Sequence, residues 1–249
     1  MVIQRLKTLF YDTRYKAFRF LDQAFRPDME EEFKEIHKKC KRYTITSVQK
    51  MYSLYSAIKY VVQHTIPGDI VECGVFKGGS AMIMALTLNK MNDLERKLYL
   101  YDTYAGMTKP AKGDTNYRGE DVESIWRQSQ RKDYNEWCYA PLEEVKNNLY
   151  STGYPKENFM FIKGKVEETI PAVIPDTIAL LRLDTDWYES TYHELLHLFP
   201  RLSVHGVLVL DDYGCLKGAK EATDKYFSEN GIKILLNRID YSGRICIKV

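Results

Sequence analysis

From residue 69 to the C-terminus, short apolar runs alternate with stretches of helical periodicity, and this alternation constrains the fold more than any other feature. Such alternation is typical of βαβ units and of a parallel sheet. The apolar runs predict strands at 69–75, 97–102, 159–164, 178–184, 206–211, 233–239 and 243–248. The stretches between them predict helices at 79–90, 142–151, 167–173, 190–201 and 218–229. We therefore expect an α/β domain built on a mainly parallel sheet.

The last two predicted strands are joined by a very short connection around Tyr241 and Ser242. A crossover between parallel strands needs a dozen or more residues, so this connection is too short for one. We expect these strands to form an antiparallel hairpin that closes the sheet.

Two helical stretches precede the sheet. Apolar residues recur at helical spacing through 2–25, with basic residues between them. We interpret this stretch as a helix packed on its own domain, or on a second copy in a homodimer or higher homo-oligomer; a basic helix on a membrane surface is the alternative. Residues 44–47, Thr-Ile-Thr-Ser, are typical of a helix cap, and Pro67-Gly68 would end that helix. The sequence thus predicts an N-terminal helical arm over 1–66, packed on a core domain over 67–249.

Residues 104–141 interrupt the alternation, because they are rich in Tyr, Trp, Lys and Asp and poor in aliphatic side chains. A long irregular segment inside a compact domain is usually functional. We interpret it as a lid whose aromatic faces could meet a sugar or another ring, although packing is an equal alternative for several of them. The lid residues concerned are Tyr104, Met107, Tyr117, Trp126, Trp137 and Tyr139.

The overall charge and the cysteines exclude several classes of function. Lys+Arg 36 against Asp+Glu 34 leaves a net charge of +2, which gives no electrostatic basis for binding nucleic acid. No run of about 20 apolar residues is present, so we expect no stable membrane insertion. The 5 cysteines are widely spaced and contain no CxxC pair, which predicts free thiols in a reducing compartment, the cytoplasm.

Acidic residues and glycines follow the predicted strands, where ligands of open α/β sheets bind. The first strand carries Glu72 and leads into a turn with Gly74, and the second strand ends at Asp102. Such a turn lets the backbone approach a small molecule, and an acid at the second strand can accept from both hydroxyls of a ribose. Together they predict a nucleoside-containing cofactor; a tight turn beside a solvated aspartate is the alternative.

Three further acids follow the fourth and fifth strands: Asp184, Asp211 and Asp212. If these strands are neighbours, the carboxylates converge, and they repel one another unless a cation compensates them. Ligation by oxygen alone selects Mg²⁺, Ca²⁺ or Mn²⁺ over zinc. We expect a metal site here, provided that the chain has already turned at Asp212; helix capping by one or two of these acids is the alternative.

Residues 193–197, His-Glu-Leu-Leu-His, match the zinc-protease pattern H-E-x-x-H. A zinc hydrolase using His193 and His197, with a later acid such as Glu221 as third ligand, is therefore a competing hypothesis. Against it, Pro200 and Ser203 stand where the longer form of the motif needs Gly and His. The periodicity also predicts an ordinary surface helix, with its apolar stripe on the sheet and the Glu roughly opposite.

Several ordered motifs resemble the macrocin O-methyltransferase (TylF-type) family, which methylates sugar hydroxyls with S-adenosylmethionine. The similarity runs from about residue 43 to the C-terminus. Its motifs are Met51-Tyr-Ser-Leu-Tyr55, Gly68-Asp-Ile-Val-Glu-Cys-Gly-Val-Phe-Lys-Gly-Gly-Ser80, Tyr101-Asp-Thr-Tyr-Ala-Gly-Met107, Lys163-Gly-Lys-Val-Glu-Glu-Thr169, Leu181-Arg-Leu-Asp-Thr-Asp-Trp-Tyr-Glu-Ser-Thr191, Asp211-Asp-Tyr-Gly214, Lys217-Gly-Ala219 and Asn237-Arg-Ile-Asp240. Two departures are His205, where a second glycine is common, and the variable pair Lys165-Val166.

The resemblance implies the class I methyltransferase fold, a Rossmann-like seven-stranded sheet with an antiparallel last pair. It also implies a cofactor site in which one group of residues surrounds the methionine moiety, another holds the ribose and a third borders the adenine. These residues are, in that order, Glu72, Gly74 and Ser80; Asp102 with Thr103; and Gly164, Lys165 and Val166, with Asp184 beside the transferred methyl. Asp184, Asp211 and Asp212 match the magnesium ligands of the family.

The resulting hypothesis is an O-methyltransferase that uses S-adenosylmethionine and Mg²⁺ (or Mn²⁺). Its acceptor would be a hydroxyl of a sugar, or of a sugar-containing or phosphorylated small molecule such as a natural product or a polysaccharide precursor. Methylation of a non-sugar phosphorylated metabolite is the alternative. Related catechol-type enzymes have a lysine three residues after the first metal aspartate, where this chain has Trp187. Asp184 is therefore the expected catalytic base, with a lid residue or His64 as the alternative.

Overall fold

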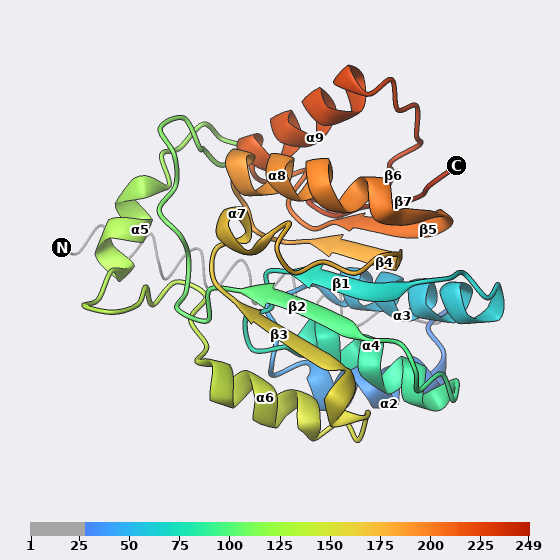
Figure 1. Cartoon of the computed structure of the whole chain (residues 1–249). Coiled ribbons are helices and arrows are strands. Elements are labelled where there is room, and N and C mark those ends of the chain that lie inside the picture. Colours follow the sequence, from blue (N-terminus) through green and yellow to red (C-terminus); the bar gives the residue numbers. More distant parts are fainter. Residues whose placement is uncertain (1–27) are drawn as a thin grey trace.

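The computed structural model describes residues 28–249, and the helix predicted at 2–25 lies outside the described residues. The described chain forms a seven-stranded sheet with helices on both faces (Figure 1). In spatial order the strands are β3 (Phe159–Lys163), β2 (Leu98–Asp102), β1 (Asp69–Cys73), β4 (Ile178–Leu183), β5 (Leu202–Leu210), β7 (Arg244–Ile247) and β6 (Asn237–Arg238).

Strands β1 to β5 pair in parallel, and β7 runs antiparallel to both of its neighbours. The predicted α/β sheet with an antiparallel last pair is therefore confirmed. Two details differ from the prediction: β7 inserts between β5 and β6, and β6 is reduced to two residues. The stretch before β6 lies outside the ladder and leaves Leu235 77% exposed, so its apolar residues do not form a buried strand.

Two buried clusters cover the two faces of the sheet. One cluster joins alternate strand residues to α2 (Glu31–Cys40), α3 (Val48–Gln63), α4 (Gly79–Lys90) and α6 (Leu142–Tyr150). The other joins the opposite residues to α7 (Val166–Thr169), α8 (Tyr188–Leu198) and α9 (Lys217–Glu229). Short 3-10 turns at Lys156–Asn158 and Phe199–Arg201 precede β3 and β5. This arrangement leaves the carboxyl ends of the parallel strands open at one edge (Figure 1).

The arm contributes directly to this core. Ser47 caps α3 by accepting from the Lys50 N–H at 3.2 Å, in agreement with the predicted cap. Helix α2 was not predicted, because only Phe33, Ile36 and Cys40 of its largely charged sequence are buried. Since α2 and α3 share one cluster with β1, the division into an arm and a core domain at residue 66 stays a prediction.

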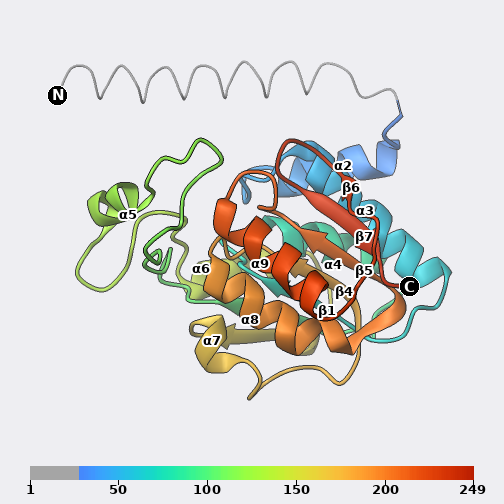
Figure 2. The same cartoon turned by 90° about the horizontal axis from the view of Figure 1, so that it is seen from above.

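The lid segment lies beyond the carboxyl ends of the strands (Figures 1 and 2). It carries a short helix, α5 (Glu123–Ser129). The Tyr117 N–H donates to the Cys215 carbonyl at 2.9 Å, so the segment is attached to the chain just before α9. In the part of the chain that the structure describes, no helix is long and apolar enough to cross a membrane.

Candidate active site

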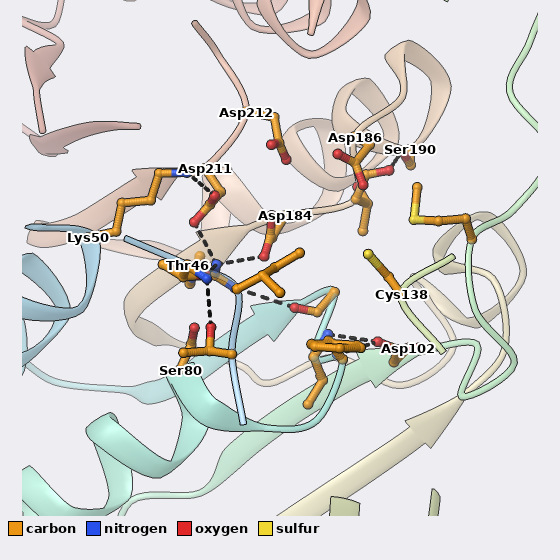
Figure 3. Close-up of a pocket in the computed structure, with 18 of the residues that line it drawn as sticks. Thr46, Lys50, Ser80, Asp102, Cys138, Asp184, Asp186, Ser190, Asp211 and Asp212 are labelled. Carbon is orange, nitrogen blue, oxygen red and sulfur yellow. Dashed lines mark hydrogen bonds and ion pairs between the residues drawn. The ribbon is translucent and has the colours of Figure 1, made fainter. Parts of the chain in front are cut away.

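A cavity of about 660 Å³ opens at the carboxyl edge of the sheet. Its walls include the glycine turn after β1, the ends of β2, β3, β4 and β5, and the lid. Two further segments were not predicted to contribute: residues 44–50 of the arm and residues 240–242 before β7. Figure 3 shows the aspartates that follow β4 and β5 on one side of this space, with Ser80, Asp102 and Cys138 on other sides. The cavity therefore joins the predicted cofactor site to the predicted metal site.

The glycine turn has a conformation and a packing that only glycine permits at its first position. Gly74 has φ +85°, and a Cβ there would lie 1.9 Å from the Asp184 carbonyl oxygen. The backbone of the turn therefore rests directly on the backbone that follows β4.

Asp102 holds this turn in place. Its Oδ2 accepts from the N–H groups of Val75 at 2.7 Å and Phe76 at 3.0 Å, and its Oδ1 accepts from the Tyr104 N–H at 2.7 Å. Burial raises the pKa of Asp102 and outweighs the backbone hydrogen bonds that lower it. The residue predicted to hold a ribose thus lines the cavity and also fixes the loop beside it.

Most residues predicted to bind the cofactor meet in this one cavity. Those that line it are Gly74, Ser80, Asp102, Thr103, Gly164, Lys165, Val166 and Asp184. Glu72 is fully buried outside the lining, where it pairs with Arg182 at 2.8 Å between Oε1 and Nη1.

The three predicted metal ligands also come together. One carboxylate oxygen from each of Asp184, Asp211 and Asp212 lies within 4.8 Å of the others. The strand has turned after Asp211, as the prediction required, because the Asp212 carbonyl already accepts from the Cys215 N–H at 3.0 Å. Asp212 Oδ2 is buried and has no hydrogen-bond partner among the described residues. A carboxyl oxygen without a partner, beside two further aspartate side chains, fits a divalent cation.

Two buried cations, neither of them predicted, reach the same acids. Arg182 of β4 donates through Nη2 to Asp184 Oδ2 at 2.6 Å and to Asp211 Oδ2 at 2.5 Å. Lys50 of α3 pairs through Nζ with Asp211 Oδ1. Part of the carboxylate charge is thus neutralised by the chain itself. The sequence did contain an indication that Lys50 is buried, since this residue lies on the apolar side of α3 next to Met51.

The acids differ in their pKa values because these cations contact them unequally. Burial acts to raise the pKa of Asp211, but Lys50 and Arg182 outweigh it and hold this pKa below its usual range. Burial raises the pKa of Asp184 well above its usual range despite Arg182, and neighbouring acids add to the rise. The pKa of Asp212 rises to about 8 through burial and then through Asp186 and Asp211. Asp211 is therefore the member of the triad whose pKa is held low, and a bound cation would favour ionisation of the other two.

Asp186 joins this cluster in a strained backbone conformation. Its φ is +71°, and the Trp187 N–H donates to the Thr185 carbonyl at 2.8 Å, which makes Asp186 the centre of a γ-turn. Burial, followed by Asp184 and Asp211, raises the pKa of Asp186 well above its usual range. Strained residues of this kind cluster at functional sites, and Asp186 lines the cavity.

The H-E-x-x-H residues take no part in a metal site. His193 Nε2 lies 2.9 Å from the Ile170 carbonyl oxygen, within hydrogen-bond distance. Among residues 28–249, the group that could hold a metal is the aspartate triad and includes neither His193 nor His197. The expectation that Glu194 faces away from the sheet is wrong: it is fully buried, and Thr185 Oγ1 donates to it at 2.9 Å.

The predicted lid residues divide into cavity walls and packing. Met107 and Trp137 line the cavity, and Trp137 packs edge-on against Trp187 with ring centroids 5.9 Å apart. Tyr104 is buried and donates to the Leu100 carbonyl, and Tyr117 is 59% exposed. The other predicted aromatic residues make contacts within the lid: Trp126 Nε1 donates to the Met107 carbonyl, and Tyr139 stacks on Tyr134.

The alternative base His64 is exposed at the end of α3, against Tyr60.

Several known proteins are similar to this chain in sequence or in fold. The family model described as "Macrocin-O-methyltransferase (TylF)" matches residues 4–247. Demethyldecarbamoylnovobiocin O-methyltransferase of Streptomyces niveus is 28% identical over 237 residues, covering 95% of this chain and 87% of that protein. The 8-demethyl-8-(2,3-dimethoxy-α-L-rhamnosyl)-tetracenomycin-C 4'-O-methyltransferase of Streptomyces olivaceus is 30% identical over 201 residues, covering 81% of this chain and 74% of that protein.

The solved structure of the O-methyltransferase NovP is similar over nearly its whole length. The TM-score is 0.75 at 25% identity, with 97% of this chain and 99% of that chain covered. The calicheamicin methyltransferase CalS11 shares the fold at 17% identity and a TM-score of 0.62, with 95% and 92% covered. With a family match over almost the whole sequence and a cavity that joins a glycine turn to an aspartate triad, this chain belongs to the macrocin O-methyltransferase (TylF) family and is an S-adenosylmethionine-dependent O-methyltransferase.

Proposed function

We propose that this chain transfers the methyl group of S-adenosylmethionine to a hydroxyl of a sugar or a sugar-containing small molecule, with the help of Mg²⁺ or Mn²⁺. The observation that carries the proposal is the single cavity shared by the glycine turn and the aspartate triad. A methyl donor and a hydroxyl held together there would react without a further encounter, and such positioning accounts for a large part of enzymatic rate acceleration.

The cofactor would lie across the carboxyl ends of β1, β2 and β3. Gly74 and Ser80 would surround its methionine end, and Asp102 with Thr103 would hold the ribose. The adenine would lie at residues 164–166, just after β3. This placement is supported by the turn that Asp102 fixes, because a preformed loop loses little conformational freedom on binding.

The metal would be held by Asp184, Asp211 and Asp212. When bound, a divalent cation lowers the pKa of a coordinated hydroxyl and orients it. The unpartnered Asp212 Oδ2 supports this assignment, since a buried carboxylate oxygen without a donor is otherwise unfavourable. Asp184 would accept the hydroxyl proton, because it lines the cavity beside the other two ligands and its carboxylate would be ionised once the cation is bound.

The acceptor would lie between the triad, the lid and the arm. Trp137 offers an aromatic face on this side of the cavity, and such faces suit the apolar side of a sugar ring. The names of the two curated relatives described above specify natural products, which supports a sugar-containing acceptor.

Cytoplasmic location and self-association belong to the same proposal. All 5 cysteines are free thiols, and Cys40, Cys73 and Cys246 are buried, which suits a reducing compartment. Light scattering on the purified chain would measure whether it forms the homo-oligomer proposed here.

Methyl-transfer assays with a panel of nucleotide sugars and glycosylated small molecules test the acceptor class.

The metal is tested by Asp212→Asn. Asp224→Asn on the outer face of α9 is the control, because among the described residues Asp224 pairs there with Lys220 and Tyr213 at the surface. Asp212→Asn should lose Mg²⁺-dependent turnover while its affinity for S-adenosylhomocysteine is retained, and Asp224→Asn should behave as the wild type. Full activity in EDTA would exclude the metal, and activity on no glycosylated acceptor would exclude the acceptor class.

A further inference from the structure

Lys50 occupies a position that is unusual for a lysine. It is 6% exposed, it comes from the helical arm rather than from the sheet, and its ammonium pairs with Oδ1 of Asp211. Asp211 Oδ2 is taken by Arg182 at 2.5 Å. Both oxygens of this proposed metal ligand are therefore engaged by cationic donors.

The arm is held at this place by neighbouring contacts, so the ammonium is delivered by ordered backbone. The Gly79 N–H donates to the Tyr43 carbonyl at 3.1 Å, and Ser47 Oγ donates to Asp240 Oδ2 at 2.6 Å. Lys50 follows Ser47 by one turn of α3, and both residues line the cavity.

The three aspartates of the triad do not share these donors equally. Arg182 contacts Asp184 and Asp211, whereas Asp212 Oδ2 has no hydrogen-bond partner among the described residues. The carboxylate oxygens of the triad lie within 4.8 Å of one another, so a cation bound among them would be a close neighbour of the Lys50 ammonium. Two positive charges at such a distance repel each other, most strongly where water is excluded.

We propose that Lys50 competes with the divalent cation for Asp211: it holds this carboxylate in place before the metal arrives, and it weakens metal binding until its ammonium is displaced from Oδ1. The inference rests on the proposed metal-dependent function and deepens it by naming a positioning residue that sets the affinity of the metal. Asp212, which has the free oxygen, then makes the first contact with the cation, and Asp211 joins afterwards.

Titration calorimetry of the full chain with Mg²⁺, without acceptor, tests this inference independently of turnover. Lys50→Met removes the charge and Lys50→Gln keeps a hydrogen-bond donor without it, and both should bind Mg²⁺ about tenfold more tightly than the wild type, or better. Lys50→Arg keeps the charge and should bind as the wild type does. Lys59→Met is the matched control, because Lys59 lies on the same helix and pairs with Glu30 at 3.2 Å, outside the cavity lining.

A second measurement guards against misfolding and separates the two proposals. Affinity for S-adenosylhomocysteine should be equal in all variants, and melting without metal should occur at a lower temperature in Lys50→Met, with a larger stabilisation by Mg²⁺. If the wild type binds Mg²⁺ and Lys50→Met binds it equally or more weakly, the competition is refuted while the metal site stands. If neither protein binds Mg²⁺ or Mn²⁺, the metal-dependent function and this inference both fall.

Discussion

Glu72 and Arg182 are register partners on neighbouring strands β1 and β4, and their side chains form an ion pair with 2.8 Å between Oε1 and Nη1. The pair is almost completely buried, with side-chain exposures of 0% and 2%. From this position Arg182 also reaches Asp184 and Asp211, so one guanidinium connects the interior of the sheet to the acids of the cavity.

Replacing this guanidinium should be strongly destabilising. Arg182→Met leaves Glu72, Asp184 and Asp211 without their shared partner, and removing one member of a buried ionic group typically costs about 3–5 kcal/mol. Urea denaturation would measure the change in the free energy of unfolding. Arg201→Met is the control: Arg201 pairs with exposed Asp176 at 3.9 Å, and the change there should stay below about 1 kcal/mol. If Arg182→Met lowers the free energy of unfolding no more than Arg201→Met does, the buried network adds no stability.

Asp102→Asn should impair binding of the methyl donor more than it impairs folding. The carboxylate of Asp102 accepts hydrogen bonds through both oxygens, from Val75, Phe76 and Tyr104, whereas the amide of Asn has only one acceptor oxygen. The glycine turn therefore loses part of its support, and a ribose loses an ionised acceptor. We expect an affinity for S-adenosylhomocysteine that is lower by about tenfold or more, measured by calorimetry.

The control for this variant is Asp69→Asn at the opposite end of β1. There a carboxylate oxygen likewise accepts from a backbone N–H, that of Lys97 at 2.9 Å, but outside the cavity lining. Its affinity for S-adenosylhomocysteine should equal that of the wild type. An unchanged affinity in Asp102→Asn would contradict the ribose assignment.

Stability without divalent ions should fall as pH rises. The pKa of Asp212 is raised from 3.8 to about 8 in the folded chain by burial and then by Asp186 and Asp211. Between these values the folded state holds a proton that the unfolded state has lost, so the free energy of unfolding decreases as the pH rises towards about 8. Because Mg²⁺ binds the ionised carboxylate, its stabilising effect should increase over the same range.

Melting temperatures with and without Mg²⁺, recorded at intervals from about pH 6 to pH 9, would measure both trends. Asp212→Asn should abolish the rise in melting temperature that Mg²⁺ causes. It should remove only part of the pH dependence of the melting temperature, since burial also raises the pKa of Glu72 to about 8, despite Arg182. A stabilisation by Mg²⁺ that is independent of pH would argue against Asp212 as a ligand.

Trp137→Ala should weaken binding of the acceptor without affecting the methyl donor. Trp137 lines the cavity on the lid side and packs against Trp187, whereas Tyr117 of the same segment is 59% exposed and lies outside the lining. We expect the KM for a glycosylated acceptor to rise about tenfold in Trp137→Ala and to stay unchanged in Tyr117→Ala. Steady-state kinetics with saturating S-adenosylmethionine would show the difference, and an equal KM in both variants would place the acceptor elsewhere.

The central sheet was predictable because its strands are buried on both faces and therefore read as continuous apolar runs. Every residue of β4 is buried, and its range agrees with the prediction to within one residue. The aspartates that follow β4 and β5 could also be placed together, because parallel neighbours end at the same edge of a sheet. Helix α2 escaped prediction, since only three of its ten residues are buried.

The cations and the inward face of α8 could not be predicted from local patterns. Helix α3 was expected, but the pairing of Lys50 with Asp211 depends on how the arm packs against β5, over a separation of 161 residues. For α8, Leu196 suggested an apolar stripe that excludes Glu194, yet Leu196 is 47% exposed and Glu194 is buried. Thr185 Oγ1 compensates the buried carboxylate with a hydrogen bond that no local pattern indicates.

The close approach of Gly74 to the Asp184 carbonyl has a consequence for how new acceptors could be accommodated. The spacing between the glycine turn and the aspartates is set by adjacent backbones in the middle of the sheet, so it cannot be adjusted without rebuilding that sheet. Other walls include parts of 44–50, 104–141 and 240–242, which lie in or beside connections at its rim. Engineering of a new acceptor preference would therefore exchange these three connections between relatives and leave the interior of the sheet untouched.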